Sequence, residues 1–226
     1  MVPRIAVVIP ALNEAGNIPH VLGDIPAGVT TIVVDNGSTD DTAQVAAECG
    51  AVVLHERQKG YGSAVQAGLR YLEHHPHDIV VILDADHADD PSLMPRLTDP
   101  IANDEADFVL ANRTLTADSG ALEPAQRAGN WLATRLMKLA TGYRYQDMGP
   151  FRAMRWSSLQ ALRMEDPTWG WNVEMQMKAV HHGLRIREVS LPYRKRRSGR
   201  SKISGSVRGT VKAGSRILWA VHRYRR

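Results

Sequence analysis

Residues 79–86 read Ile-Val-Val-Ile-Leu-Asp-Ala-Asp, five apolar residues followed at once by Asp-Ala-Asp. A run of apolar and β-branched residues without polar alternation is typical of a strand that is buried on both faces. Residues 5–9 and 30–34 have the same character, and each run leads into a polar cluster. Ligands of open α/β sheets bind beyond the carboxyl ends of the strands. We therefore expect the polar clusters to meet at one functional edge of a mostly parallel sheet.

Strands and helices alternate along the rest of the chain. Further strands are predicted at residues 51–55, 107–111 and 185–191. Helices are predicted at residues 17–23, 42–48, 63–73, 126–139, 172–182 and 206–223. This alternation predicts an α/β sandwich with a mostly parallel central sheet flanked by helices.

The composition is that of an ordinary globular protein, with 226 residues of which 43% are hydrophobic and 23% charged. This length fits one domain. The single cysteine, Cys49, excludes an intrachain disulfide. The chain shows no signal peptide and no apolar run near the roughly 18 residues that span a bilayer, so we expect a soluble, cytoplasmic protein.

The net charge of +4 is unevenly distributed. Residues 194–226 contain 12 of the 28 Lys and Arg residues and no Asp or Glu, so the remainder carries 16 basic against 24 acidic residues. A basic tail on an acidic body predicts an anionic partner for the tail.

The pair Asp84 and Asp86 predicts a metal site. Residues i and i+2 of an extended segment point to the same side, and two neighbouring carboxylates repel each other unless a cation lies beside them. Oxygen ligands favour hard ions such as Mg²⁺ or Mn²⁺, whose shells substrate phosphates complete. The alternative is a solvated turn that caps the helix after Pro91, a purpose that Asp89 and Asp90 serve better.

Four segments together resemble a known family. They are residues 8–14 (Val-Ile-Pro-Ala-Leu-Asn-Glu), 34–40 (Val-Asp-Asn-Gly-Ser-Thr-Asp), 59–62 (Lys-Gly-Tyr-Gly) and 83–86 (Leu-Asp-Ala-Asp). In this order they resemble the family-2 glycosyltransferases of the GT-A fold, in particular the polyprenyl- (dolichyl-) phosphate sugar synthases. The resemblance implies one GT-A domain over residues 1–204. Residues 205–226 would form a basic amphipathic helix within that domain or appended to it.

The resemblance also implies residues that bind a nucleotide diphosphate sugar. They are Pro10, Leu12, Glu14, Asp35, Gly37, Ser38, Lys59, Gly62, Asp84, Ala85 and Asp86. Asp35 would bind the base, and Asp84 and Asp86 would form the DXD pair that places Mg²⁺ or Mn²⁺ on the diphosphate. The family often continues with an apolar residue and Gln, where this chain has His87 and Ala88. His87 is therefore either a replacement metal ligand or an exposed turn residue.

The remaining matches concern the reaction. The resemblance implies Asp86, Arg113, Asp147 and Glu174 as catalytic candidates. Arg196, Arg197, Arg200, Ser201 and Lys202 resemble the family's Arg-x-x-Gly-x-Ser-Lys loop, which folds over the diphosphate. Cationic side chains directed at a leaving diphosphate stabilise the charge that develops there. An anionic lipid phosphate acceptor needs no general base, whereas for a hydroxyl acceptor Glu174 or Asp147 would take the proton.

We therefore expect a metal-dependent, inverting glycosyltransferase that uses a UDP- or GDP-sugar and a polyprenyl phosphate acceptor. The alternatives are a soluble or glycan hydroxyl acceptor, a sugar-nucleotidyltransferase, or a non-catalytic module that binds membrane or nucleic acid. Residues 206–223 would contact an anionic membrane surface through basic residues and Trp219, or simply dock on the domain. No stacking platform accompanies the charge, so nucleic acid is not expected as a partner. The sequence leaves a homo-oligomer open.

Overall fold

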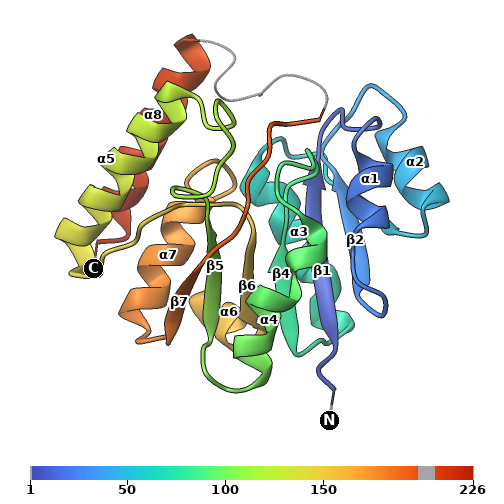
Figure 1. Cartoon of the computed structure of the whole chain (residues 1–226), viewed down its shortest axis with the longest axis horizontal. Coiled ribbons are helices and arrows are strands. Elements are labelled where there is room, and N and C mark those ends of the chain that lie inside the picture. The colour runs from blue at the N-terminus through green and yellow to red at the C-terminus, as the bar shows by residue number, and fades with distance from the viewer. Residues whose placement is uncertain (1, 198–206, 226) are drawn as a thin grey trace.

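The computed structural model describes residues 2–197 and 207–225, and all side chains in these ranges except those of 207–213. Within these ranges the centre of the molecule is a seven-stranded sheet in the order β3-β2-β1-β4-β6-β5-β7 (Figure 1). The strands are β1 (Ile5–Ala11), β2 (Thr30–Asp35), β3 (Val52–His55), β4 (Ile79–Ile82), β5 (Phe108–Asn112), β6 (Arg152–Arg155) and β7 (Ile186–Ser190). Only β6 runs antiparallel to its neighbours, β4 and β5. The predicted mostly parallel sheet is confirmed.

Helices cover both faces of the sheet. They are α1 (Ile18–Gly23), α2 (Thr42–Glu48), α3 (Tyr61–His74), α4 (Pro95–Ala102), α5 (Pro124–Thr141), α6 (Trp156–Leu162), α7 (Trp171–His181), α8 (Val207–Arg223) and a short 3-10 helix, η1 (Pro91–Leu93). Side chains of β1 alternate between two cores: Ala6 and Val8 pack with α3, α5, α6, α7 and α8, whereas Val7 and Ile9 pack with α1, α2 and α4. Because both faces are covered, the strands are continuously apolar, as their sequence predicts.

Every strand and helix expected from the sequence is present within two residues of its predicted bounds, although Ser206 lies outside the described residues. Four elements have no counterpart among the predicted ranges: η1, α4, β6 and α6. β6 has only two apolar residues among four, Ala153 and Met154, so it lacks the apolar run of a buried strand. α4 begins at Pro95 and contains Pro100, which interrupts the pattern of a helix.

Helix α8 packs on the body of the protein beside α5, as Figure 1 shows. Ala220, Val221 and Tyr224 are buried in the core that α5 and α7 also line. Arg216 forms an ion pair with Asp166 at 2.9 Å, and Arg223 forms one with Glu165 at 3.2 Å. None of the helices in the described ranges is long and apolar enough to cross a membrane.

Candidate active site

The carboxyl ends of β2, β1 and β4 lie side by side. Hydrogen bonds join the loops that follow β1 and β2. The backbone N–H of Asn13 donates to Ser38 Oγ at 2.9 Å, and Asn13 Oδ1 accepts from the N–H of Thr39 at 2.7 Å. The N–H of Ser38 in turn donates to Asp35 Oδ1 at 3.1 Å. The loops after β1 and β2 therefore form one surface at the predicted functional edge.

Asn36 connects this surface to the loop that precedes α3. Its amide nitrogen donates to the carbonyls of Glu56 and Gln58, and its Oδ1 accepts from the N–H of Gly60 at 2.7 Å. A Cβ atom at Gly37, where φ is +84°, would lie 3.9 Å from Cε of Lys59. The Lys59 side chain thus lies next to Gly37, in the polar cluster that follows β2. Asn36 was not among the predicted site residues, although it lies inside the motif that was quoted for them.

The start of α3 rests on a second turn, residues 165–169. Pro167 O accepts from the N–H of Ser63 at 2.9 Å, and a Cβ atom at Gly62 would lie only 2.0 Å from Asp166 O. The missing side chain of Gly62 leaves room for this turn, and its contact with the nucleotide stays a prediction. Tyr61, between the two glycines, stacks on Trp169 with ring centroids 6.3 Å apart.

The aspartate pair follows β4 at the same edge of the sheet. Asp84 Oδ1 is buried and has no hydrogen-bond partner in the described ranges. Burial and the neighbouring charge of Asp86 raise the pKa of Asp84 to about 7. Asp86 is better partnered, because its Oδ1 accepts from the N–H of Ala88 at 3.0 Å and its Oδ2 contacts Arg196. In this pair, Asp84 thus has an oxygen without a partner in the described ranges, whereas the charge of Asp86 is balanced by Arg196.

His87 turns away from this pair. Its Nε2 lies 2.8 Å from Asp24 Oδ2 at the end of α1, and its ring packs near that of His20 with centroids 5.9 Å apart. No trio of His, Cys, Asp or Glu in the described part of the chain is arranged to hold a metal ion. The structure therefore does not favour the predicted ligand role of His87, since the ring is engaged by α1.

Residues 192–197, which we call the strap, cross the mouth of the site. The N–H of Arg194 donates to Ala88 O at 2.8 Å, and Tyr193 forms bridges with Asp89 and Ala117. Arg196 Nη1 lies 3.1 Å from Glu14 Oε1 and its Nη2 lies 2.8 Å from Asp86 Oδ2. Arg197 is exposed, and Arg200, Ser201 and Lys202 lie outside the described residues. The strap thus directs at least one cationic side chain at the aspartate pair.

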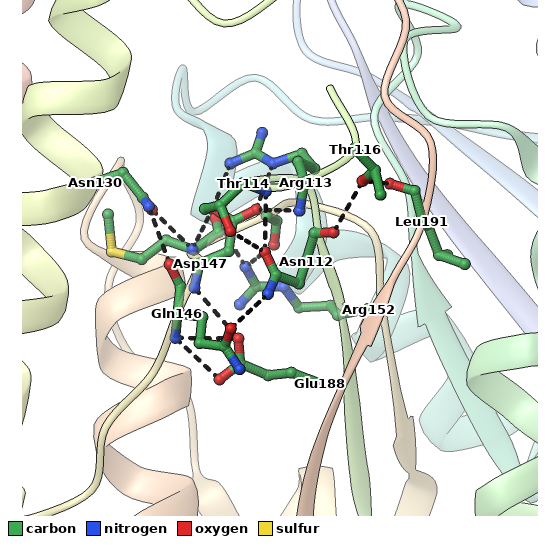
Figure 2. Close-up of polar contacts among 12 residues, drawn as sticks. Asn112, Arg113, Thr114, Thr116, Asn130, Gln146, Asp147, Arg152, Glu188 and Leu191 are labelled. Carbon is green, nitrogen blue, oxygen red and sulfur yellow. Dashed lines mark hydrogen bonds and ion pairs between the residues drawn. The ribbon is translucent and has the colours of Figure 1, made fainter. Parts of the chain in front are cut away.

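On the other side of the strap, Asp147 and Arg113 form a buried ion pair (Figure 2). Arg113 Nε and Nη2 donate to the two carboxylate oxygens of Asp147 at 2.8 and 2.9 Å, and the N–H of Met148 donates at 2.7 Å. Burial would raise the pKa of Asp147, but the guanidinium and these donors hold it below the usual value. Asp147 is only 1% exposed, so no oxygen is free to accept a proton from an acceptor.

Glu174 is also fully engaged. Its carboxylate accepts from the N–H groups of Glu165 and Asp166 at 2.8 and 2.7 Å, and it forms an ion pair with Lys178 at 2.7 Å. The residue is completely buried. The prediction of Glu174 and Asp147 as general bases does not fit these positions, because one carboxylate holds the 165–169 turn and the other holds Arg113.

Comparison with known proteins decides the family. Residues 6–163 match the family model described as glycosyl transferase family 2. This chain belongs to glycosyltransferase family 2. It is 38% identical to an uncharacterized glycosyltransferase of Mycobacterium tuberculosis over 208 residues, which cover 92% of this chain and 93% of the relative. It is 30% identical to the undecaprenyl-phosphate mannosyltransferase of Micrococcus luteus over 220 residues, which cover 91% and 90% of the two chains.

Solved structures agree with this assignment. The structure of glucosyl-3-phosphoglycerate synthase from Mycobacterium tuberculosis with Mn²⁺, UDP and glucosyl-3-phosphoglycerate matches with a TM-score of 0.75 and 26% identity. The match covers 97% of this chain and 80% of the other. The GT-A fold expected from the sequence is therefore confirmed for this glycosyltransferase, and its family includes enzymes related to polyprenyl-phosphate sugar synthesis.

The glycosyltransferase fold brings the predicted donor residues to neighbouring strand ends. Pro10 and Leu12 belong to β1 and its loop, Asp35 ends β2, and Ala85 lies between the two aspartates after β4. Asp35 Oδ2 also lies 3.3 Å from His55 Nδ1 on β3. Besides Asn36, sequence reasoning missed a second buried residue of this edge, Asp89.

Proposed function

We propose that this protein is a metal-dependent, inverting glycosyltransferase that moves a sugar from a UDP- or GDP-sugar to a polyprenyl phosphate. The observation that carries the proposal is the Asp84–Asp86 pair at the carboxyl end of β4, in which one buried carboxylate oxygen has no partner among the described residues. An unpartnered carboxylate beside a second carboxylate is unfavourable unless a cation joins them. The names of relatives at 30% and 26% identity support a polyprenyl phosphate acceptor.

The residues present fit Mg²⁺ or Mn²⁺. Asp84 and Asp86 offer only oxygen ligands, which hard divalent cations prefer. When bound, the cation would neutralise charge on the donor diphosphate. A structural neighbour solved with Mn²⁺ and UDP supports a divalent cation here.

Arg196 is the side chain that would change partners during the reaction. Without ligand it bridges Glu14 and Asp86, so it already lies over the aspartate pair. A diphosphate bound there offers the guanidinium a bidentate anionic partner. We expect Arg196 to bind the diphosphate and to stabilise the charge that grows on it as the sugar leaves.

The carboxylates of the second half favour an anionic acceptor. Asp147 and Glu174 are both saturated with hydrogen bonds and ion pairs, so neither is placed to deprotonate a hydroxyl. A phosphate oxygen is already ionised at neutral pH and attacks without such a base. A soluble hydroxyl acceptor is the second candidate, and the structural neighbour solved with phosphoglyceric acid favours it.

Helices α5 and α8 support contact with a membrane that holds a lipid acceptor. Together they contain seven Lys or Arg residues and no Asp or Glu. Their largest exposed apolar side chains are Trp131, Leu132, Leu139, Leu218 and Trp219. Arg135 stacks over Trp131 and Arg216 over Trp219, at 4.5 and 3.8 Å from the ring centroids. Exposed Trp and Leu among basic residues suit the interface of an anionic leaflet.

The test is transfer of labelled sugar into the organic phase. The full chain, Mn²⁺ or Mg²⁺ and UDP- or GDP-hexoses are incubated with undecaprenyl phosphate in anionic vesicles or detergent. We expect a lipid product from the wild type and about 10²- to 10³-fold less from Asp86→Asn, because a stabilising group at the leaving charge is lost. Asp99→Asn, an exposed carboxylate on α4, is the matched control and should retain activity. Nucleotide-sugar turnover that is unchanged in Asp86→Asn would refute the proposal.

A further inference from the structure

Asp89 is a buried carboxylate whose side chain bonds no residue in the described part of the chain. It is 2% exposed, and neither of its side-chain oxygens has a hydrogen-bond partner in the described ranges. The sequence suggested that Asp89 or Asp90 caps the following helix, but only Asp90 does so, by accepting from the N–H of Ser92 at 3.1 Å. Buried polar groups in native proteins are almost always bonded. An exception at the edge of an active site indicates a group that is bonded by the ligand.

The surroundings of Asp89 place it between the aspartate pair and the strap. Its backbone bridges Tyr193, and Arg113 lies over the Tyr193 ring, 4.9 Å from its centroid. Burial raises the pKa of Asp89 well above its usual value. The positive charge of Arg113 opposes this shift, whereas the negative charges of Asp86, Asp84 and Asp147 add to it. The Nε and Nη2 of Arg113 donate to Asp147, and no hydrogen bond joins Arg113 to the Asp89 carboxylate. Asp89 therefore lies next to the strap with two buried side-chain oxygens that have no hydrogen-bond partner in the described ranges.

The geometry does not support a third metal ligand. Asp84, Asp86 and Asp89 all belong to the described residues, and no trio of His, Cys, Asp or Glu among these converges on a point where an ion could bind. The group that satisfies Asp89 must therefore donate hydrogen bonds. In a nucleotide diphosphate sugar bound at the Asp84–Asp86 pair, the groups beyond the diphosphate that donate hydrogen bonds are the hydroxyls of the sugar.

We propose that Asp89 accepts hydrogen bonds from hydroxyl groups of the donor sugar and thereby selects the hexose. The proposal rests on the proposed function, because it assumes that Asp84 and Asp86 hold the diphosphate. Sugar hydroxyls lose water when they enter a closed site and need an acceptor there. A site built to bond a hydroxyl discriminates strongly against a sugar that presents none at that position, since its own buried group is then left unpaired.

The test separates the sugar from the nucleotide. Dissociation constants are measured with Mn²⁺ for UDP, UDP-glucose, GDP and GDP-mannose on the wild type, Asp89→Asn, Asp89→Ala and the surface control Asp99→Asn. For the base that the wild type binds, we expect Asp89→Ala to weaken the nucleotide sugar about 10- to 100-fold. Asp89→Asn retains one acceptor and should lose less. Affinity for the nucleoside diphosphate alone should change less than about twofold, within the scatter of such measurements.

The fold is checked independently. Asp89→Asn replaces a buried carboxyl group, which has no hydrogen-bond partner in the described ranges, by a neutral amide of the same shape, so its melting temperature should equal or exceed that of the wild type. Equal weakening of UDP and UDP-glucose, or no weakening of either, in a folded variant would overturn the sugar-binding role. Unchanged affinities with lost transfer to a hydroxyl acceptor would overturn it in favour of a general base. A wild type that binds none of the nucleotides would instead refute the proposed function itself, and this inference with it.

Discussion

Asp89 at the mouth of the site is as deeply buried as Asp147 and Glu174 in the second half of the chain, yet these carboxylates are bonded in opposite ways. Asp147 and Glu174 accept hydrogen bonds from backbone N–H groups and each pairs with a cation, Arg113 or Lys178. Among the residues that the structure describes, the Asp89 side chain has no hydrogen-bond partner, and one oxygen of Asp84 has none. The saturated carboxylates hold the fold, whereas the unsaturated ones are available to a ligand. Burial alone therefore does not identify a functional acid in this protein.

The largest effect expected from this contrast is the loss of a saturated carboxylate. Asp147→Ala leaves the Arg113 guanidinium buried without its countercharge, which costs about 3–5 kcal/mol of unfolding free energy. Urea denaturation of both proteins measures this difference. Asp99→Ala is the control, because Asp99 is exposed on α4 and alanine suits a helical position. A loss below 1 kcal/mol for Asp147→Ala would show that the pair does not hold the fold.

Glu174→Gln is expected to have a smaller effect. The amide accepts one backbone hydrogen bond but leaves the other N–H and Lys178 without a charged partner, so we expect a loss of about 1–3 kcal/mol. Sugar transfer per folded molecule, measured at a temperature well below the melting point, should stay within a few fold. Intact stability with turnover reduced by orders of magnitude would restore the general-base role predicted from the sequence.

The contrast also explains how much of the site the sequence could predict. The three strand ends were found because apolar runs that stop at polar clusters depend only on local sequence. Glu174 was assigned to catalysis because the sequence pattern of an acidic residue at the start of a helix is the same for a catalytic base and for a structural hydrogen-bond acceptor. Its actual partners are N–H groups of residues 165 and 166, in a turn whose conformation the sequence does not specify.

Strand β6 was missed for a related reason. Arg152 lies in the middle of the sheet and is 1% exposed, so a charged residue occupies a core position. Its guanidinium is accommodated by carbonyl groups at Met148 and Gly149, contacts that only the folded chain creates. Asp89 likewise looked like a helix cap, since nothing local separates it from Asp90.

A third effect concerns pH and the unsaturated pair. With its pKa raised to about 7 in the protein without metal, Asp84 must lose a proton before it binds a cation. Below that pH we expect the apparent Mn²⁺ affinity to fall about tenfold per pH unit, because one proton competes with the ion. Calorimetric titrations with Mn²⁺ between pH 5.5 and 8.5 would measure this slope.

The raised pKa of Asp84 affects metal affinity and stability in opposite directions: as pH rises, the Mn²⁺ affinity increases and the stability of the metal-free protein decreases. A raised folded-state pKa makes the native form bind the proton more tightly than the unfolded chain, so stability falls as pH rises from about 4 to 7. Asp84→Asn should abolish the slope of the Mn²⁺ affinity and reduce the slope of stability, to which the raised pKa of Asp89 still contributes. A Mn²⁺ affinity that does not vary between pH 5.5 and 8.5 would contradict an Asp84 site.

The smallest effect is expected for His87. Its partner Asp24 is about half exposed, so His87→Asn should change the unfolding free energy by about 1 kcal/mol or less. Asn is chosen because it tolerates the left-handed backbone at this residue, where φ is +59°. The increase in melting temperature on addition of Mn²⁺ with UDP should match that of the wild type. A smaller increase would return His87 to the metal site.

The turn at residues 165–169 has a practical consequence for any shortened form of the chain. On one side it touches Gly60 and Gly62 at the start of α3, and on the other it pairs with Arg216 and Arg223 of α8. A truncation before Arg216 would leave the buried Asp166 carboxylate without its cation and would also expose the core beneath Ala220. The damage would reach the loop that carries Lys59 and Tyr61, on the far side of the turn. The last two dozen residues are thus not a dispensable tail, and a deletion meant to remove membrane contact would also weaken the donor site.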